Sequence, residues 1–276
     1  MPASPSPIRP SEPSDLSDVV SVLRDAGSVF AEDEARLILA EAHTPEQVAV
    51  MVEQRASGLP LEHVLGWAEF CGRRIAVEPG VFVPRRRTEL LVREAAALLR
   101  SDAGSVVVDL CCGSGAVGAA LTATVPGIEL YAADLDAAAV RCARRNVLTA
   151  ACVYEGDLFE PLPDSLRGRI DLLAANVPYV PTGEIGLLPP EARVHESPVA
   201  LDGGADGLEV LRQVSAGVGE WLAPGGHVLF ETSEQQAPEA MRVLSGDGLA
   251  ARVASSDELS ATVVVGTRAC RRRVSG

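Results

Sequence analysis

The 276-residue chain contains no lysine, only two asparagines and three tyrosines, and only 4% aromatic residues. Its 24 basic residues, all of them arginine, are outnumbered by 38 acidic residues, so the formal net charge is −14. Such a negative chain is a poor candidate for sequence-independent nucleic-acid binding, which depends on neutralising phosphates. The scarcity of aromatic rings points the same way, because single strands are bound by stacking on them. We therefore expect no nucleic-acid partner.

Long apolar runs and paired cysteines are also missing. No run of 18 apolar residues occurs, and the N-terminus lacks a basic start followed by an apolar core, which argues against a membrane span and a secretory signal. The six cysteines form no CxxC pair and no metal-ligand cluster with the four histidines. Reduced thiols and no bound metal are therefore expected. We predict a cytoplasmic monomer with no membrane partner.

The pattern of apolar residues divides the chain into a leader and two domains. Residues 1–13 contain five prolines interleaved with serine, which predicts a disordered leader. Residues 14–66 show helical periodicity and indicate a small N-terminal helical domain. Alternation within residues 67–83 predicts a β-hairpin linker to the larger domain, residues 84–276.

In the larger domain, helical and strand-like segments alternate. Apolar runs without polar alternation, separated by helices, are typical of a mainly parallel sheet covered on both faces, and they predict an α/β domain. The expected strands are 106–110, 128–133, 151–155, 170–175, 227–232, 249–254 and 261–267. The expected helices are 88–100, 116–124, 136–148, 205–222 and 236–245.

A glycine-rich turn follows the first of these strands. Residues 113–118 read Gly-Ser-Gly-Ala-Val-Gly and match GxGxxG, and Asp134 follows about 20 residues later. This spacing fits a dinucleotide site or an S-adenosylmethionine site, because in both the glycines admit the ligand and the acid binds ribose hydroxyls. A tight strand–helix turn without any ligand is the third interpretation.

Two further carboxylates favour the methyl donor over the dinucleotide. Asp109 lies four residues before Gly113, where it would stabilise the ammonium group of a methionine moiety but repel a pyrophosphate. Asp157 and Leu158 follow the third strand, where a carboxylate would lie near an adenine amino group. The sequence thus favours S-adenosylmethionine.

A compact turn, Asn176-Val177-Pro178-Tyr179, follows the fourth strand. The Asn176 side-chain oxygen and the Val177 carbonyl can each accept one N–H of an NH₂ group, while Pro178 keeps Val177 extended and Tyr179 offers a flat wall. An amide or aniline-like nitrogen is a poor nucleophile because its lone pair is delocalised. Two acceptors would aim that lone pair at a methyl group and would bind more strongly as positive charge develops. The alternative is an ordinary turn in which Asn176 bonds only its neighbours.

The combined order of motifs resembles the HemK/PrmC family, the S-adenosylmethionine-dependent methyltransferases that modify the glutamine side-chain nitrogen of peptide chain release factors. The matching residues, spread over most of the chain, are Gly58-Leu59-Pro60-Leu61, Gly66, Phe70, Pro84-Arg85, Thr88-Glu89, the glycine-rich turn, Asp134, Asp157, the turn at 176–179, Gly203-Gly204, Asp206-Gly207-Leu208, Glu231 and Gln236. The resemblance implies a class I methyltransferase domain with a Rossmann-like, seven-stranded, mainly parallel sheet and an antiparallel last strand. It also implies that the helical domain helps to grip the release factor.

The motifs and the resemblance together define an expected site. The expected S-adenosyl-L-methionine contacts are Asp109, Cys111, Gly113, Gly115, Asp134, Leu135, Asp157, Leu158 and Asn176. The expected catalytic residues are Asn176, Val177, Pro178 and Tyr179. The expected substrate contacts are Arg85, Thr88, Glu89 and Tyr179. The implied acceptor is the glutamine of the Gly-Gly-Gln loop, and the implied second product is S-adenosyl-L-homocysteine.

The chain departs from the family pattern in four places. Val177 replaces the first proline of Asn-Pro-Pro-Tyr, which keeps the carbonyl acceptor but loses rigidity worth about 0.4–1 kcal/mol. Arg86-Arg87 replaces Pro-Glu, Cys111 replaces a common glycine, and Glu196-Ser197-Pro198 replaces Glu-Pro-Arg. These departures leave open a family paralogue with another protein substrate.

Three functions of other classes also stay open on the sequence. One is methylation of an exocyclic amine of RNA or DNA, for which Arg85-Arg86-Arg87 and Arg271-Arg272-Arg273 are the candidate basic patches. Another is a donor-binding protein that has lost catalysis and serves as an interaction module. The last is a nicotinamide oxidoreductase, because the glycine-rich turn alone does not separate the two cofactors.

Overall fold

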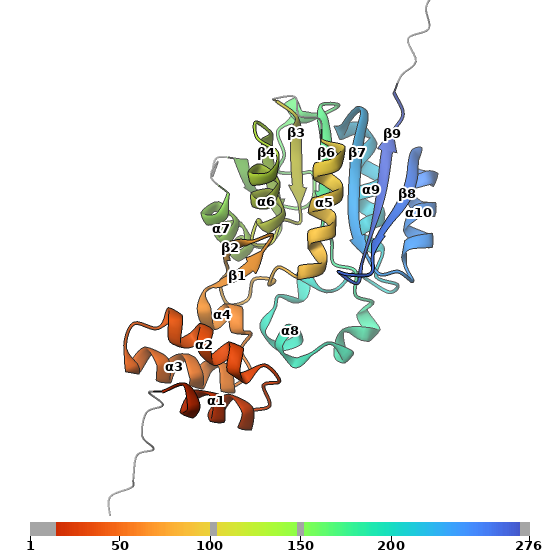
Figure 1. The fold of residues 1–276 in the computed structure, drawn as a ribbon. Coiled ribbons are helices and arrows are strands. Elements are labelled where there is room, and N and C mark those ends of the chain that lie inside the picture. The colour runs from red at the N-terminus through yellow and green to blue at the C-terminus, as the bar shows by residue number, and fades with distance from the viewer. Residues whose placement is uncertain (1–14, 100–103, 148–151, 271–276) are drawn as a thin grey trace, which may run out of the picture. The chain divides into compact units, whose positions relative to one another are not determined.

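The computed structural model describes residues 15–99, 104–147 and 152–270 (Figure 1). The chain divides into two compact units, Met1–Gly66 and Trp67–Gly276. The predicted leader, 1–13, and the second arginine triplet, 271–273, lie outside the described residues. Within the described ranges, no helix combines the length and the apolar character that crossing a membrane requires.

Four helices form the described part of the first unit: α1 (Leu16–Asp25), α2 (Ala31–Glu41), α3 (Pro45–Ala56) and α4 (Leu61–Leu65). The start of α3 follows from its sequence, because the Thr44 side chain accepts a hydrogen bond from Gln47 N and proline occupies the first turn. Apolar side chains of α1, α2 and α3, including Leu23, Ile38 and Val52, are buried as the core of this unit.

The second unit contains a seven-stranded sheet in the order β5-β4-β3-β6-β7-β9-β8. The strands in chain order are β3 (Val106–Leu110), β4 (Glu129–Asp134), β5 (Val153–Glu155), β6 (Ile170–Ala175), β7 (Leu222–Thr232), β8 (Leu249–Ser256) and β9 (Ala261–Arg268). The first five run parallel, and β9 is antiparallel to both of its neighbours. This arrangement confirms the predicted α/β fold with an antiparallel last strand.

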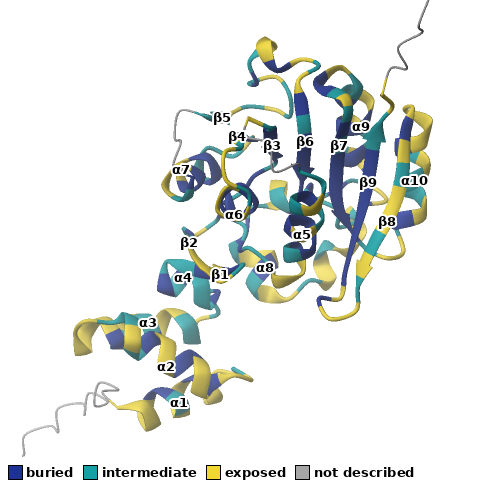
Figure 2. Ribbon diagram, turned by 45° about the horizontal axis from the view of Figure 1, so that its top comes forward, coloured by how far each residue is buried: buried dark blue, intermediate teal, exposed yellow. Residues whose placement is uncertain are grey.

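Helices cover both faces of this sheet (Figure 1). One apolar cluster joins the sheet to α5 (Glu89–Leu98), α6 (Ala116–Thr124) and α7 (Ala137–Asn146). The opposite cluster joins it to α9 (Glu209–Trp221) and α10 (Ala237–Gly246). Figure 2 shows the central strands as buried along most of their length, whereas β8 at the edge is largely exposed or half-buried. Burial on both faces explains why the central strands lack polar alternation.

The second unit also contains a hairpin and a short helix outside the large sheet and its covering helices. Strands β1 (Trp67–Phe70) and β2 (Arg73–Ala76) form an antiparallel hairpin. Helix α8 (Pro190–His195) lies within the long connection between β6 and α9, and it was not predicted.

Two predicted boundaries of helices and strands differ from the structure by more than two residues. The helix expected from residue 205 begins at Glu209, because Gly207 has a left-handed φ of +76° and ends the preceding loop. The strand expected from 227 begins at Leu222, and its pairing with β6 shifts register between Ile170 and Leu172.

Candidate functional site

The glycine-rich turn and the turn at 176–179 meet at the carboxyl ends of the central strands. Leu110 at the end of β3 pairs with Ala133 of β4 on one side and with Ala175 of β6 on the other. The strand order reverses between β3 and β6, and open α/β sheets bind ligands at such a point. The glycine-rich turn leaves β3 and Asn176 leaves β6, so the structure brings both motifs to this point.

The three glycines of the turn have different local roles. A Cβ on Gly115 would lie 3.0 Å from a side chain of α7, and one on Gly118 would lie 3.0 Å from Leu130, so both positions require close packing. Around Gly113, whose φ is +54°, nothing lies within 4 Å of the Cβ position. Gly113 therefore borders open space on which a ligand can lie.

Cys111 also adopts a left-handed conformation, with φ of +55°. Burial raises the pKa of its thiol well above the ordinary value, and the carboxylates of Asp134, Asp109 and Asp157 raise it further. The same burial raises the pKa of Cys112. Neither thiol is ionised near neutral pH, which agrees with packing residues rather than nucleophiles.

Asp134 fastens the glycine-rich turn to the end of β4. Its two carboxylate oxygens accept hydrogen bonds from Gly113 N at 2.8 Å and from Asp136 N at 2.9 Å. Burial raises the pKa of this carboxyl. Its backbone oxygen accepts from Gly156 N at 3.0 Å, which ties the end of β5 to the same place. The carboxylate therefore lies directly beside the open side of Gly113.

Asp109 makes a contact with helix α6 that the sequence did not predict. Its carboxyl is 2% exposed, and Oδ2 accepts a hydrogen bond from Gly118 N at 2.8 Å. Gly118 is in the first turn of α6, whose N-cap, Gly115, has no side chain to offer. Asp109 thus caps α6 from the neighbouring strand. Burial, and next the charge of Asp134, raises its pKa to about 8.

Three further expected residues follow β4 and β5. Leu135 is 53% exposed although it is apolar, and Asp157 is exposed as well. Leu158 is half-buried and has a positive φ of 43°. An exposed leucine next to Asp134 offers an apolar surface for a flat ring.

The two asparagines of the chain differ sharply. Asn146 is fully engaged: its Nδ2 donates to Ala76 O and Ser114 O, each at 2.8 Å, and its Oδ1 accepts from Ala76 N at 2.8 Å. Within the part of the chain that the structure describes, the Asn176 side chain has no hydrogen-bond partner, and neither has the Val177 carbonyl. The two acceptors predicted to hold an NH₂ group are therefore not used by the fold itself.

Tyr179 is held at its hydroxyl. The hydroxyl donates to Glu231 Oε1 at 3.0 Å, and Arg87 Nε donates to the same oxygen at 3.1 Å. The Arg87 guanidinium lies 5.6 Å from the centre of the Tyr179 ring. Burial raises the pKa of Tyr179, and the charge of Glu231 adds to this shift. The ring is thus a neutral, fixed wall.

Of the expected substrate contacts, Arg85 is bound to Glu196 at 2.6 Å, and its guanidinium lies 4.9 Å from the ring centre of Phe82. Thr88 is buried, and its hydroxyl has no hydrogen-bond partner among the described residues. Glu89 accepts from the backbone N of Cys71 in the hairpin at 3.2 Å. Among the described residues, Glu89 makes no hydrogen bond or ion pair with Tyr179 or its neighbours in the turn.

The basic triplet at 85–87 is neutralised residue by residue. Arg85 pairs with Glu196 at 2.6 Å, Arg86 with Glu258 at 3.7 Å, and Arg87 with Glu231 at 3.1 Å. These partners lie more than 100 positions away along the chain, so no local pattern indicates the pairing. A patch that is paired in this way has little charge left for phosphates.

Comparisons with known proteins agree with this geometry. The model of the methyltransferase small domain matches residues 73–205. The release factor glutamine methyltransferase of Geobacter sulfurreducens is 36% identical over 230 residues, 81% of this chain and 79% of that protein. A 4-amino-L-phenylalanine/4-methylamino-L-phenylalanine methyltransferase of Streptomyces pristinaespiralis is 38% identical over 191 residues, 67% of this chain and 65% of that protein. A methyltransferase of Pyrococcus furiosus shares the fold, with a TM-score of 0.53 at 14% identity over 72% of this chain and 90% of that one.

Proposed function

The chain belongs to the release factor glutamine methyltransferase family, and from this membership we propose that it methylates the side-chain nitrogen of the Gly-Gly-Gln glutamine in peptide chain release factors. The observation that carries the proposal is the pair of unused acceptors, Asn176 Oδ1 and the Val177 carbonyl, at the switch point of the sheet. An amide NH₂ group has two N–H donors, one for each acceptor.

The turn would act mainly by orientation. Asn176 and Val177 accept the two N–H bonds of the glutamine amide and draw its nitrogen out of conjugation. Both acceptors gain strength as positive charge develops on that nitrogen, so they favour the transition state over the ground state. The fixed ring of Tyr179 closes one side of the amide and holds it in line.

Residues of the first three strand ends fit S-adenosylmethionine as the donor. When bound, this group supplies a methyl carbon on a sulfonium, which is an electrophile. The open side of Gly113 admits the ligand, the Asp134 carboxylate beside it would accept ribose hydroxyls, and exposed Leu135 would cover the adenine ring. Asp109 would face the ammonium group and Asp157 the adenine amino group.

We expect Asp134→Ala to weaken S-adenosylmethionine binding by about tenfold, because a charged acceptor for ribose hydroxyls is lost, worth about 1.5 kcal/mol. Calorimetric titration measures the Kd. Asp136→Ala is the matched control two residues away: it removes the cap that Asp136 gives to Ala138 N in α7, so it should lower stability while the donor Kd stays within about twofold. Equal losses of affinity in both variants would contradict the role of Asp134.

Incubation with a release factor and methyl-labelled donor tests the proposed function. Label should appear on the factor and should vanish when its target glutamine is replaced by alanine. Peptide mass spectrometry would assign the added methyl to the Gly-Gly-Gln peptide. Label on a different protein in cell extract, with none on the factor, would instead identify a paralogue with another substrate.

A small aromatic amine is the second candidate acceptor. The Streptomyces pristinaespiralis relative is named for methyl transfer to 4-amino-L-phenylalanine, and an aniline nitrogen poses the same lone-pair problem as an amide. The same assay with 4-amino-L-phenylalanine as acceptor separates the two: turnover on this compound but not on a release factor would favour it. The neutralised triplet at 85–87 and the charge of −14 weigh against the nucleic-acid alternative.

We also propose that the helical unit contributes to gripping the protein substrate. It has a groove of about 420 Å³ whose lining includes Val50, Met51, Val64, Leu65, Glu41 and Glu46. Val50 is 52% exposed. An apolar floor beside the Glu46 carboxylate fits an apolar side chain next to a basic one.

Val50→Asp is therefore expected to raise KM for a whole release factor by about tenfold, a typical cost of about 1.4 kcal/mol for losing a good apolar contact. KM for a short Gly-Gly-Gln peptide should not change, because we expect such a peptide to bind only at the turn that holds its glutamine and not in the groove. Val29→Asp is the matched control, since Val29 is 84% exposed in the same unit but outside the groove lining. Equal effects of the two variants would argue against the groove.

A further inference from the structure

Loop 203–207, which precedes α9, packs backbone against backbone on the turn at 176–179. A Cβ on Gly203 would lie 2.7 Å from Pro178 O, and one on Gly207 would lie 2.2 Å from Tyr179 O. Hydrogen bonds join the same two stretches of chain just beyond the turn: Gly203 N donates to Val180 O at 2.9 Å, and Val180 N donates to Leu201 O at 3.1 Å. Any side chain at Gly203 or Gly207 would push the turn away from this loop.

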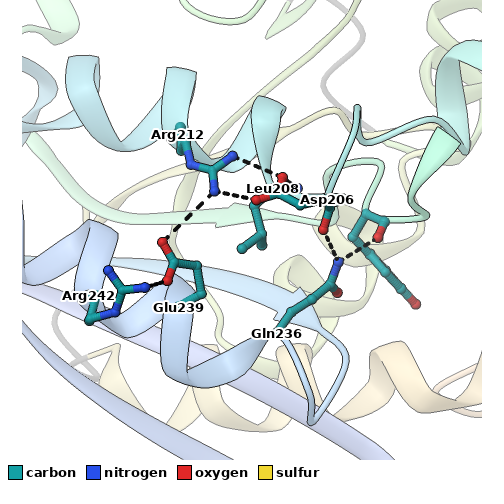
Figure 3. A network of polar contacts seen from close by, with 7 residues as sticks. Asp206, Leu208, Arg212, Gln236, Glu239 and Arg242 are labelled. Carbon is teal, nitrogen blue, oxygen red and sulfur yellow. Dashed lines mark hydrogen bonds and ion pairs between the residues drawn. The ribbon is translucent and has the colours of Figure 1, made fainter. Parts of the chain in front are cut away.

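Gln236 joins the same two segments with its side chain (Figure 3). Its Nε2 donates to Tyr179 O at 2.9 Å and to Asp206 O at 3.0 Å, which uses both N–H groups. Its Oε1 accepts from Ser233 Oγ at 2.8 Å and from Thr232 Oγ1 at 3.3 Å. A side chain with all of its polar groups engaged has one orientation, so Gln236 fixes the position of the Tyr179 carbonyl.

The loop itself is tied to the helices behind it. The Asp206 carboxylate binds Arg212 of α9 through two hydrogen bonds, and it accepts from Leu208 N at 3.1 Å. Arg212 in turn lies 3.9 Å from Glu239 of α10, which pairs with Arg242 (Figure 3). The guanidinium of Arg212 lowers the pKa of Asp206 to about 2, so this link stays charged at neutral pH.

We propose that Gln236 is a positioning residue for methyl transfer, and that it fixes the turn at 176–179 against loop 203–207. This inference rests on the proposed function. The two peptide groups that follow Val177 are in contact with other parts of the chain. Pro178 O lies against Gly203, and Tyr179 O accepts a hydrogen bond from Gln236. Among the described residues, no hydrogen bond uses the Val177 carbonyl, so it can accept from the substrate. Because residue 177 is not proline, the turn lacks part of its own rigidity, and contacts from outside must keep that carbonyl aimed.

A purely structural role would look different. Gln236 is also the N-cap residue of α10, and its Oε1 bonds within the segment 232–236. If that were its whole function, replacing it would destabilise α10 and leave turnover per folded molecule unchanged. The two interpretations therefore differ in kcat and not only in stability.

Gln236→Glu tests the proposal with a side chain of the same shape. Its carboxylate cannot donate, and it would set a negative oxygen against the carbonyl oxygens of Tyr179 and Asp206. We expect kcat on a release factor to fall at least about tenfold, while the Kd for S-adenosylmethionine and the KM for the factor stay within about twofold. Gln236→Ala, which removes both donors without adding charge, should lower kcat in the same way.

Arg242→Gln is the matched control, because Arg242 belongs to the same polar network but is 75% exposed and pairs with Glu239 of α10. It should keep kcat within about twofold. Unchanged kcat in Gln236→Glu, or an equal loss in Arg242→Gln, would overturn the proposal.

Amide hydrogen exchange gives a readout that needs no methyl acceptor. The N–H groups of Val180 and Gly203 should exchange at least about tenfold faster in Gln236→Glu than in the unaltered protein, whereas amides of β3 should not change. If the unaltered protein methylates no release factor, the proposed function fails, and this measurement still decides whether Gln236 fixes the turn. Unchanged exchange at both amides would overturn the inference in either case.

Discussion

Replacing Asn176 with alanine is expected to lower kcat roughly 10- to 150-fold while the Kd for S-adenosylmethionine changes little. The side-chain oxygen accepts an N–H of the target nitrogen as that nitrogen becomes positive, and such a charge-assisted hydrogen bond contributes about 1.5–3 kcal/mol. Stability should hardly change, because Asn176 has no hydrogen-bond partner among the described residues. Single-turnover kinetics with saturating donor measures the effect on the chemical step, and thermal unfolding measures stability.

Asn146→Ala is the control for a structural asparagine. Asn146 is the other of the two asparagines in the chain, and its side chain forms hydrogen bonds with backbone groups. It should lower the free energy of unfolding by about 1–3 kcal/mol, because backbone groups of Ala76 and Ser114 lose their partner. A loss of stability in Asn176→Ala as large as this, with kcat intact, would make Asn176 an ordinary turn residue. Asn176→Asp separates shape from chemistry, because it keeps an acceptor oxygen in the same place and should retain more activity than alanine.

The parts of the fold that the sequence predicted best are those set by local pattern. Strands 106–110 and 170–175 and helix 116–124 were predicted with the bounds that β3, β6 and α6 have. Each is a mainly apolar run whose end is marked by a change in residue type, so the hydrophobic period and the boundary coincide. The meeting of the glycine-rich turn and Asn176 followed as well, because parallel strands bring their carboxyl ends to one edge.

The features that the sequence did not predict depend on contacts between distant segments. The bonds of Arg85 to Glu196 and of Arg87 to Glu231 join residues 111 and 144 positions apart, so the triplet looked like a basic patch. Gly207 looked like part of a helix, yet Gln236, 29 positions later, holds the loop that contains it through Asp206 O. The motif order included Gln236 and Glu231 without a role for either, because a role needs a partner and the partner is set by packing.

The free protein is expected to lose stability as pH rises from about 4 to about 8, and Asp109→Asn is expected to remove much of that loss. Burial raises the pKa of Asp109 from 3.8 to about 8, so the folded chain holds a proton that the unfolded chain releases above about pH 4. Its contribution is therefore fully present below pH 4 and disappears as pH passes about 8, with a total of up to about 5 kcal/mol. Asparagine keeps an oxygen for Gly118 N and never ionises.

Thermal unfolding of the two proteins across pH measures the difference. At pH 9 the variant should melt higher than the unaltered protein by on the order of 10 °C, and near pH 4 the two should melt together. Donor binding tests the second role of Asp109, contact with the ammonium group of S-adenosylmethionine. If that ammonium group meets the Asp109 carboxylate, binding releases the proton from Asp109. Donor affinity should then rise with pH up to about 8 in the unaltered protein and stay constant in Asp109→Asn. Parallel melting curves would show that Asp109 is already ionised in the fold. Parallel affinity curves would leave it only its contact with Gly118 at the start of α6.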